Sequence, residues 1–211
     1  MSNKDTLLCL SGGLDSSSLL FEYRDRIAMA VTFDYGSTQN QREQRSAKLV
    51  AEKAGIPWKL IDVKGVFSGF KSALLESPEA IPVGDYNAEN MAATVVPFRN
   101  GIFLSILAGL AESQGCKYVA LAAHSGDHNL YPDTRPEFAD AMTQAIKLGT
   151  SNEVEFFKPY INITKREIAE RGIKAGLNPD WTYSCYKGGE NPCNECSTCR
   201  ERNESLKGLT W

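Results

Sequence analysis

The stretch LSGGLDSSSLL, residues 10–20, decides the fold, because it joins a strand-like run to a helix-like run through two adjacent glycines. Residues 6–10 are short and apolar and predict a buried strand. Beyond the glycines, Leu19 and Tyr23 recur at helical spacing, and Asp15 is typical of a first helical turn. A strand, a glycine turn and a helix N-terminus bring free backbone N–H groups and the positive end of a helix to one point. The stretch therefore predicts an anion site, most simply for a phosphate.

The pattern within this stretch distinguishes among phosphate loops. It has no Gly-Lys-Ser/Thr, so no lysine is placed as in a Walker loop, and its adjacent glycines do not fit G-x-G-x-x-G. It does fit S-G-G-x-D-S and thus resembles the PP-loop ATP pyrophosphatases. That resemblance implies a loop that binds the pyrophosphate of ATP and an enzyme that transfers AMP to a substrate oxygen. The alternative is a plain Gly-Gly turn before a serine-capped helix.

Composition limits the class of protein. The chain has 211 residues, 42% hydrophobic and 23% charged, which suits one α/β domain with a small appendage. Its longest apolar run, residues 101–111, is too short to cross a bilayer, and the N-terminus resembles no signal peptide, so we expect a cytoplasmic protein without membrane partners. A net charge of −3 and a pI near 5.5 argue against broad nucleic-acid binding.

Strand-like and helix-like segments alternate along the chain, which predicts a mostly parallel sheet with helices on both faces. The expected strands are residues 6–10, 27–33, 58–63, 117–123 and 153–158. After the first helix, the expected helices are residues 39–54, 99–114, 135–149 and 164–175. Residues 64–96 are irregular, and a loop of this length is usually functional.

Three polar clusters, residues 11–18, 34–36 and 124–128, follow predicted strands. Ligands of parallel α/β sheets lie beyond these carboxyl ends, so the three clusters predict one site. Asp34 lies about 20 residues past the glycines, a separation at which an acidic residue commonly binds a ribose. Alternatively, Asp34 only stabilises the turn into Gly36.

Four of the six cysteines crowd the C-terminus with the spacing C-x7-C-x2-C-x2-C: Cys185, Cys193, Cys196 and Cys199. Four thiolates at such intervals can surround Zn²⁺ and leave no position for a catalytic water, so we expect a structural zinc site. We accordingly divide the chain into an ATP-binding α/β domain, residues 1–180, and a zinc lobe, residues 181–211, which has too little apolar content to fold alone. Cys9 and Cys116 are expected to be small buried side chains.

Further blocks specify a family. Residues 96–105 match V-P-x-R-N-x-x-F-L-S, residues 131–138 match Y-P-D-x-R-x-E-F, and residues 184–186 read S-C-Y. With the loop and the cysteines, the chain resembles the 7-cyano-7-deazaguanine synthases of queuosine biosynthesis from Leu10 to Arg200.

The resemblance implies an α/β fold of the adenine-nucleotide alpha-hydrolase type, with a parallel sheet and a small four-cysteine zinc lobe. It implies a ligase that forms C–N bonds and uses ATP, Mg²⁺ and Zn²⁺. Such an enzyme converts 7-carboxy-7-deazaguanine and ammonia to the nitrile through adenylated intermediates, releasing AMP and diphosphate. Its partners are small molecules, without stable nucleic-acid binding. A homodimer is one option for the oligomeric state.

The resemblance also assigns site residues. The ATP-binding residues are Leu10, Ser11, Gly12, Gly13, Leu14, Asp15, Ser16, Ser17, Ser18, Leu19 and Leu20, to which the spacing from the glycines adds Asp34. The catalytic residues are Ser11, Asp15, Ser16, Arg99 and Lys165. The substrate-binding residues are Arg99, Asn100, Asp127, Tyr131, Asp133 and Arg135. The alternatives are helix capping for Arg99 and Asn100, and simple solvation for Lys165. His124 and His128 are weaker candidates.

Two departures from the family pattern concern the product. Phe98 stands where the family more often has glycine, which adds bulk near the predicted pocket, and residues 34–43 are longer than the usual block. An amide-forming variant is therefore an alternative to a nitrile synthase. A tRNA-modifying PP-loop enzyme and a non-enzymatic zinc-knuckle RNA-binding module are further alternatives, the latter disfavoured by the acidic pI.

Overall fold

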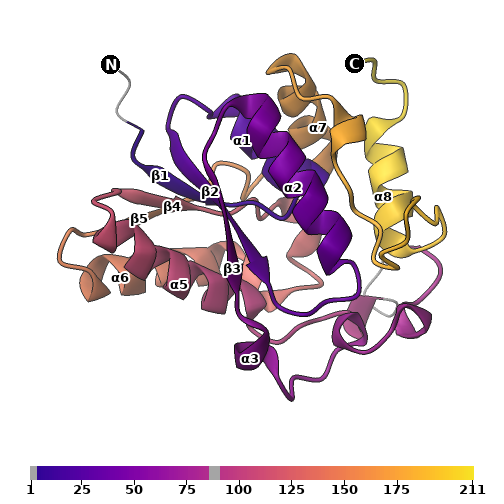
Figure 1. Cartoon of the computed structure of the whole chain (residues 1–211), viewed down its shortest axis with the longest axis horizontal. Coiled ribbons are helices and arrows are strands. Elements are labelled where there is room, and N and C mark those ends of the chain that lie inside the picture. The colour runs from indigo at the N-terminus through magenta and orange to yellow at the C-terminus, as the bar shows by residue number, and fades with distance from the viewer. Residues whose placement is uncertain (1–3, 86–90) are drawn as a thin grey trace.

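The computed structural model describes residues 4–85 and 91–211, and five parallel strands form its sheet. In chain order the strands are β1 (Thr6–Cys9), β2 (Ile27–Asp34), β3 (Trp58–Asp62), β4 (Tyr118–Ala120) and β5 (Glu155–Phe157). Their spatial order is β3-β2-β1-β4-β5, with β1 central (Figure 1). All five predicted strands are confirmed, although β4 and β5 are shorter than expected.

Helices cover both faces of the sheet, as the alternation predicts. One face carries α1 (Leu14–Glu22), α2 (Asn40–Ala54) and α7 (Lys165–Lys174), and the other carries α5 (Arg99–Ser113) and α6 (Pro136–Gly149) (Figure 1). Because successive side chains of a strand point to opposite faces, Leu7 of β1 packs in the α5 and α6 core while Leu8 packs in the core of α1, α2 and α7. The parallel α/β fold class is confirmed.

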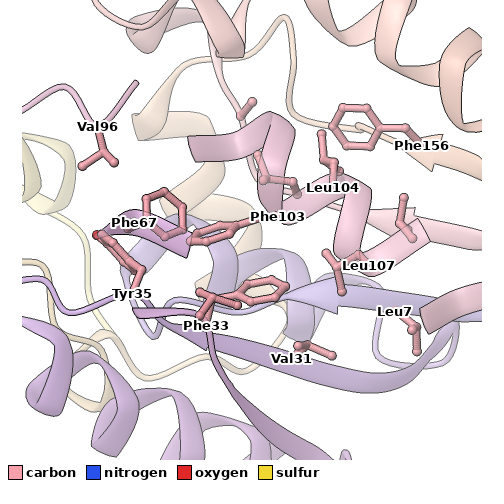
Figure 2. Packing of buried hydrophobic residues seen from close by; sticks show 14 of the residues in the cluster. Leu7, Val31, Phe33, Tyr35, Phe67, Val96, Phe103, Leu104, Leu107 and Phe156 are labelled. Carbon is pink, nitrogen blue, oxygen red and sulfur yellow. The ribbon is translucent and has the colours of Figure 1, made fainter. Parts of the chain in front are cut away.

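Aromatic packing fixes α5 against the carboxyl end of β2. Phe103 of α5 stacks on Phe33 with ring centroids 4.3 Å apart, and Tyr35 meets the edge of Phe103 at 5.6 Å (Figure 2). Such pairs contribute about 0.5–1.5 kcal/mol beyond the area they bury. The first turn of α5 is thereby held where the central strands end.

Short helices occupy part of the segment predicted to be irregular and several other connections between the main elements. They are α3 (Lys64–Phe67), η1 (Ala73–Leu75), η2 (Pro78–Ala80), η3 (Ser125–Asp127), η4 (Pro132–Thr134) and η5 (Pro179–Trp181). A full helix, α8 (Ser197–Leu206), begins directly after Cys196, contains Cys199 and was not predicted. In the part of the chain that the structure describes, no helix is long and apolar enough to cross a membrane.

Candidate active site

A cavity opens at the carboxyl ends of β1, β2 and β4, where the sequence predicts the site. Cys9 lines it at the end of β1 and Leu10 just beyond that strand. Thr32 and Phe33 line it from β2, and Leu121 lines it just beyond β4. Its polar wall combines residues from five parts of the chain: Ser11, Asp15, Ser16, Arg99, Asn100, Asp127, Lys165 and Glu201. All five residues predicted to be catalytic therefore line one cavity.

Hydrogen bonds within the signature loop hold it open toward this cavity. The Ser16 hydroxyl lies 3.0 Å from the Ser11 hydroxyl and accepts from the Ser11 N–H at 3.2 Å. Gly12 has a φ of 85°, and a Cβ there would lie 2.5 Å from the Glu43 carbonyl oxygen, so the position needs glycine. Helix α1 begins after Gly13 without a side-chain cap, and its first N–H groups are available to an anion.

The predicted ATP-binding residues divide into two groups. Leu10, Ser11, Gly13, Leu14, Asp15 and Ser16 line the cavity. The others support the loop: Gly12 by its close approach to α2, and Ser17, Ser18, Leu19 and Leu20 by complete burial in α1. Asp34 also lies off the cavity, where it accepts from the Gly36 N–H at 3.3 Å and from Asn40, and pairs with Lys64 at 3.2 Å. These contacts match the turn-stabilising alternative for Asp34.

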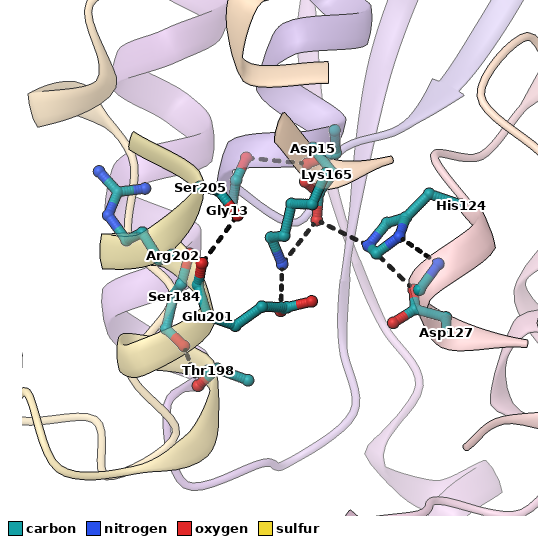
Figure 3. A network of polar contacts seen from close by, with 12 residues as sticks. Gly13, Asp15, His124, Asp127, Lys165, Ser184, Thr198, Glu201, Arg202 and Ser205 are labelled. Carbon is teal, nitrogen blue, oxygen red and sulfur yellow. Dashed lines mark hydrogen bonds and ion pairs between the residues drawn. The ribbon is translucent and has the colours of Figure 1, made fainter. Parts of the chain in front are cut away.

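Lys165 lies at one pole of the cavity between two carboxylates (Figure 3). Its ammonium is 3.1 Å from Asp15 and 2.7 Å from Glu201, and its side chain is 13% exposed, so it is not a solvated surface lysine. Burial lowers the pKa of Lys165, but the carboxylates of Asp15, Glu201 and Asp127 outweigh burial and raise that pKa above its ordinary value. Lys165 therefore carries a permanent charge at the loop.

His124 joins this pole from the other side (Figure 3). Its Nδ1 accepts from the Gly126 N–H at 3.1 Å, and its Nε2 lies 3.4 Å from Asp127 and 3.7 Å from Asp15. Because Nδ1 is an acceptor, the ring proton of a neutral imidazole is on Nε2, facing the two carboxylates. His124 is thus built into the site, whereas the sequence marked it only as a weaker candidate.

Arg99 forms the opposite pole, surrounded by tyrosines. Its guanidinium donates to the Tyr35 hydroxyl at 3.3 Å, and Tyr131 and Tyr186 lie close enough to influence its pKa. Burial lowers the pKa of Arg99, but these phenols and Asp133 together hold it above its ordinary value. No carboxylate of the described residues lies within ion-pair distance of Arg99. A buried guanidinium without a carboxylate partner suits an anionic ligand.

The predicted substrate-binding residues are only partly gathered at the cavity. Arg99, Asn100, Asp127 and Tyr131 line it. Asp133 instead accepts from the Asn100 backbone N–H at 2.9 Å, which caps the start of α5, and Arg135 donates to the His128 carbonyl at 2.8 Å. These last two residues lie behind the cavity wall and support it.

Several cavity residues were not predicted: Tyr35, Glu43, Tyr183, Ser184, Tyr186, Thr198 and Glu201. The S-C-Y block and the Asp-Tyr-Gly turn were available signals for Ser184, Tyr186 and Tyr35. Cys9 also reaches the cavity, but burial raises the pKa of its thiol to about 12, so it is not a nucleophile at neutral pH.

The four C-terminal cysteines converge as predicted. The Sγ atoms of Cys185, Cys193, Cys196 and Cys199 all lie within 4.8 Å of one another. Backbone N–H groups turn inward, Glu195 and Cys196 donating to Cys193 Sγ at 3.5 and 3.3 Å, which stabilises charged thiolates. Four sulfur donors in a closed cluster fit a structural Zn²⁺ ion.

This cluster holds one wall of the cavity in place. Thr198 donates to the Ser184 carbonyl at 2.8 Å, and the Tyr183 N–H donates to the Gly12 carbonyl of the signature loop at 2.9 Å. Glu201 of α8 pairs with Lys165 in the same wall. The cysteines therefore act on the site by positioning residues between and beside them.

Comparison with known proteins identifies the family. The family model described as queuosine biosynthesis protein QueC matches residues 5–210. The chain belongs to the QueC family. A relative from Porphyromonas gingivalis named 7-cyano-7-deazaguanine synthase is 48% identical over 203 residues, covering 96% of this chain and 92% of the relative. A relative of the same name from Desulfotalea psychrophila is 45% identical over 205 residues, covering 96% of this chain and 94% of the relative.

Solved structures support the fold of this QueC family member. An NMN synthetase from Francisella tularensis matches with a TM-score of 0.53 at 12% sequence identity, covering 99% of this chain and 79% of that one. An NH3-dependent NAD synthetase from Campylobacter jejuni matches with a TM-score of 0.50 at 15% sequence identity, covering 86% of this chain and 68% of that one. At such low identities the likeness concerns the fold alone.

Phe98 is the departure from the QueC pattern that the structure explains. It was expected to add bulk near the pocket, and the residues that line the cavity do not include it. Its ring turns outward, lies over Gly101 and meets the edge of Phe138 at 5.8 Å, leaving Phe98 57% exposed. Its φ is 54°, in the left-handed region, which accounts for the family's glycine at this position.

We predict that the variant Phe98→Gly is more stable than Phe98→Ala by about 1 kcal/mol, since both lose the ring but only glycine relieves the left-handed strain. Urea unfolding of the two variants measures this difference. Both should keep the wild-type product and turnover within about twofold, because the ring lies outside the cavity. A change of product in either variant would contradict this placement.

Proposed function

We propose that this chain makes 7-cyano-7-deazaguanine from 7-carboxy-7-deazaguanine, ammonia and ATP, releasing AMP and diphosphate. The observation that carries the proposal is one cavity with a PP-loop at one pole and, at the other, an arginine that has no carboxylate partner among the described residues. The loop suits a pyrophosphate and the arginine suits a carboxylate. An adenylation joins those two groups.

At the loop pole, Ser11, Ser16 and the first N–H groups of α1 would hold the phosphates, and Lys165 would neutralise charge that develops as the phosphate bond breaks. Asp15 Oδ1 is buried without a hydrogen-bond partner among the described residues, and a carboxylate oxygen is a preferred ligand of Mg²⁺. Asp15 therefore fits a role in holding the Mg²⁺ that accompanies ATP. That ion would supply charge neutralisation on the phosphates.

At the arginine pole, Arg99 and Asn100 would orient the substrate carboxylate at the start of α5. Asp127 and Tyr131 would face the deazaguanine, because a guanine-like edge presents N–H groups that need acceptors. The carboxylate oxygen held by Arg99 then attacks the α-phosphate, and diphosphate leaves. Ammonia displaces AMP to give the amide, whose oxygen is adenylated in turn before AMP leaves with formation of the nitrile.

The reaction needs only small molecules, and we propose a cytoplasmic enzyme that binds no nucleic acid stably. A homodimer is one option for the assembly, which sedimentation can test.

The test is incubation with ATP, ammonium and 7-carboxy-7-deazaguanine, followed by mass spectrometry. We expect AMP, diphosphate and a product lighter than the amide by one water. Ser16→Ala, which removes the hydroxyl bonded to Ser11, should form no AMP while retaining the wild-type circular dichroism spectrum. Release of ADP, or AMP release indifferent to the deazaguanine, would refute the function, and accumulation of amide would identify an amide-forming enzyme.

A further inference from the structure

Glu43 is a carboxylate of the cavity to which the proposed reaction steps assign no role. It lies in the first turn of α2, and its backbone carbonyl packs directly on Gly12 of the signature loop. Its position is thus fixed relative to the phosphate-binding residues, while its side chain lines the cavity.

The other cavity carboxylates already have cationic or imidazole partners. Lys165 pairs with Asp15 and Glu201, and His124 lies 3.4 Å from Asp127. Within residues 4–85 and 91–211, no lysine, arginine or histidine lies within 4 Å of the Glu43 carboxylate. Among the described residues, Glu43 is therefore the cavity carboxylate without a cationic or imidazole partner from the protein.

The groups that face Glu43 leave it close to the midpoint of its titration. Burial raises the pKa of Glu43 to about 7, against the lowering effects of Arg99 and the Gln39 side chain. The nearby Cys9 thiol and Tyr35 phenol interact with Glu43, and burial raises the pKa of each, so both remain neutral at pH 7. A carboxyl group of this kind can both accept and release a proton near neutral pH.

We infer that Glu43 binds ammonium and removes its proton beside the carboxylate held by Arg99. Ammonium dominates over ammonia at neutral pH, yet only ammonia has the lone pair that attacks an acyl carbon. The proton moves from ammonium to the Glu43 carboxylate, ammonia forms the C–N bond, and AMP leaves with the C–O electron pair. The amide nitrogen then loses its extra proton to water. This inference rests on the proposed function, because it assumes the activated carboxylate.

The variant Glu43→Gln tests this role, with Glu52→Gln as the matched control. Glu52 lies on the same helix, is exposed and pairs with Lys48 at 4.0 Å, so its variant should behave as wild type. We expect Glu43→Gln to retain substrate-dependent exchange of diphosphate into ATP, which needs no ammonia. Its ammonium-dependent turnover at pH 7 should fall about 100-fold or more. With hydroxylamine, a nucleophile uncharged at this pH, the variant should stay within about threefold of wild type.

Stability supplies a second measurement. A carboxyl group whose pKa is raised on folding loses stabilising effect as the pH rises from its unfolded value toward about 7. The melting temperature of Glu43→Gln should therefore exceed that of the wild type at pH 8 but not at pH 5. A variant that melts in this way is folded, so its loss of turnover cannot be attributed to unfolding.

Three results would overturn the inference: unchanged ammonium-dependent turnover in Glu43→Gln, an equal loss with ammonium and hydroxylamine, or loss of diphosphate exchange. The last would make Glu43 a positioning residue for Arg99. Failure of the wild-type enzyme to exchange diphosphate would instead refute the proposed function itself.

Discussion

Replacing Cys196 by serine should remove the metal and abolish activity, although no cysteine of the cluster is proposed to touch the substrate. Cys196 is fully buried and its Sγ lies within 4.8 Å of the other three. Structural zinc sites contribute about 10–16 kcal/mol to the folding of small domains, so loss of one ligand should release most of the ion. We expect about one zinc per chain in the wild type and almost none in the variant.

The expected loss of activity follows from what the cysteines hold. Tyr183, Ser184 and Tyr186 flank Cys185 and line the cavity, and Glu201 follows Cys199 by less than one helical turn. Disorder of this wall would free Lys165 from Glu201 and Gly12 from Tyr183. We therefore expect turnover to fall at least about 100-fold, since misplacement of such supporting groups by about 1 Å can cost that much.

Cys116→Ser is the matched control, because Cys116 is also buried but lies outside the cluster. It should keep its zinc, measured by elemental analysis, and its turnover. A Cys196→Ser protein that retains full activity without zinc would contradict the role of the cluster in shaping the cavity.

The parts of the site predicted from sequence are those that depend on local structure. The signature loop needs only a strand, two glycines and a helix start, all contiguous in residues 6–20. The four-cysteine site follows from short spacings, and the position of Arg99 from its place at the start of an apolar helix. Each of these depends on neighbours along the chain or on the general rule for parallel sheets.

The parts that were missed depend on packing between distant segments. Glu43 and Glu201 lie on helices whose charged sequences give no sign of which carboxylate faces inward. Helix α8 itself has little apolar periodicity, and its order follows from contacts such as the Arg202 bonds to Thr182 and to the Pro179 carbonyl at 2.6 and 2.7 Å. Asp133 was predicted to line the base pocket, and its bond to the backbone N–H of Asn100, 33 residues away in sequence at the start of α5, gave no signal in the sequence.

Replacing Arg99 by methionine should remove activity while leaving the fold as stable as the wild type or more so. The guanidinium is buried, and it has no carboxylate partner within ion-pair distance in the described chain. Its removal therefore leaves no orphaned buried carboxylate, and a methionine of similar length fills the space without a desolvated charge.

The activity of Arg99→Met should fall because the substrate carboxylate loses the cation proposed to hold it. Truncating one partner of a buried charge pair costs about 2–5 kcal/mol, or about 30- to 5,000-fold in kcat/KM for the deazaguanine. The kcat/KM of Arg99→Lys should lie between those of Arg99→Met and the wild type, since lysine keeps the charge but lacks the planar guanidinium that binds a carboxylate with two hydrogen bonds. Loss of Arg99 also removes the charge that lowers the pKa of Glu43, so the residual activity should require a higher pH.

Arg26→Met is the control that should show the opposite pattern. Arg26 lies before β2, at the amino end of the sheet, where its guanidinium packs over Tyr118 and Phe157 at 4.9 and 4.4 Å from the ring centroids. Its variant should lose about 0.5–1 kcal/mol of stability and keep wild-type kcat/KM. Urea unfolding and steady-state kinetics on both variants give the comparison. If Arg99→Met unfolds more easily and Arg26→Met does not, Arg99 is part of the structural core, and its guanidinium serves the fold rather than the substrate.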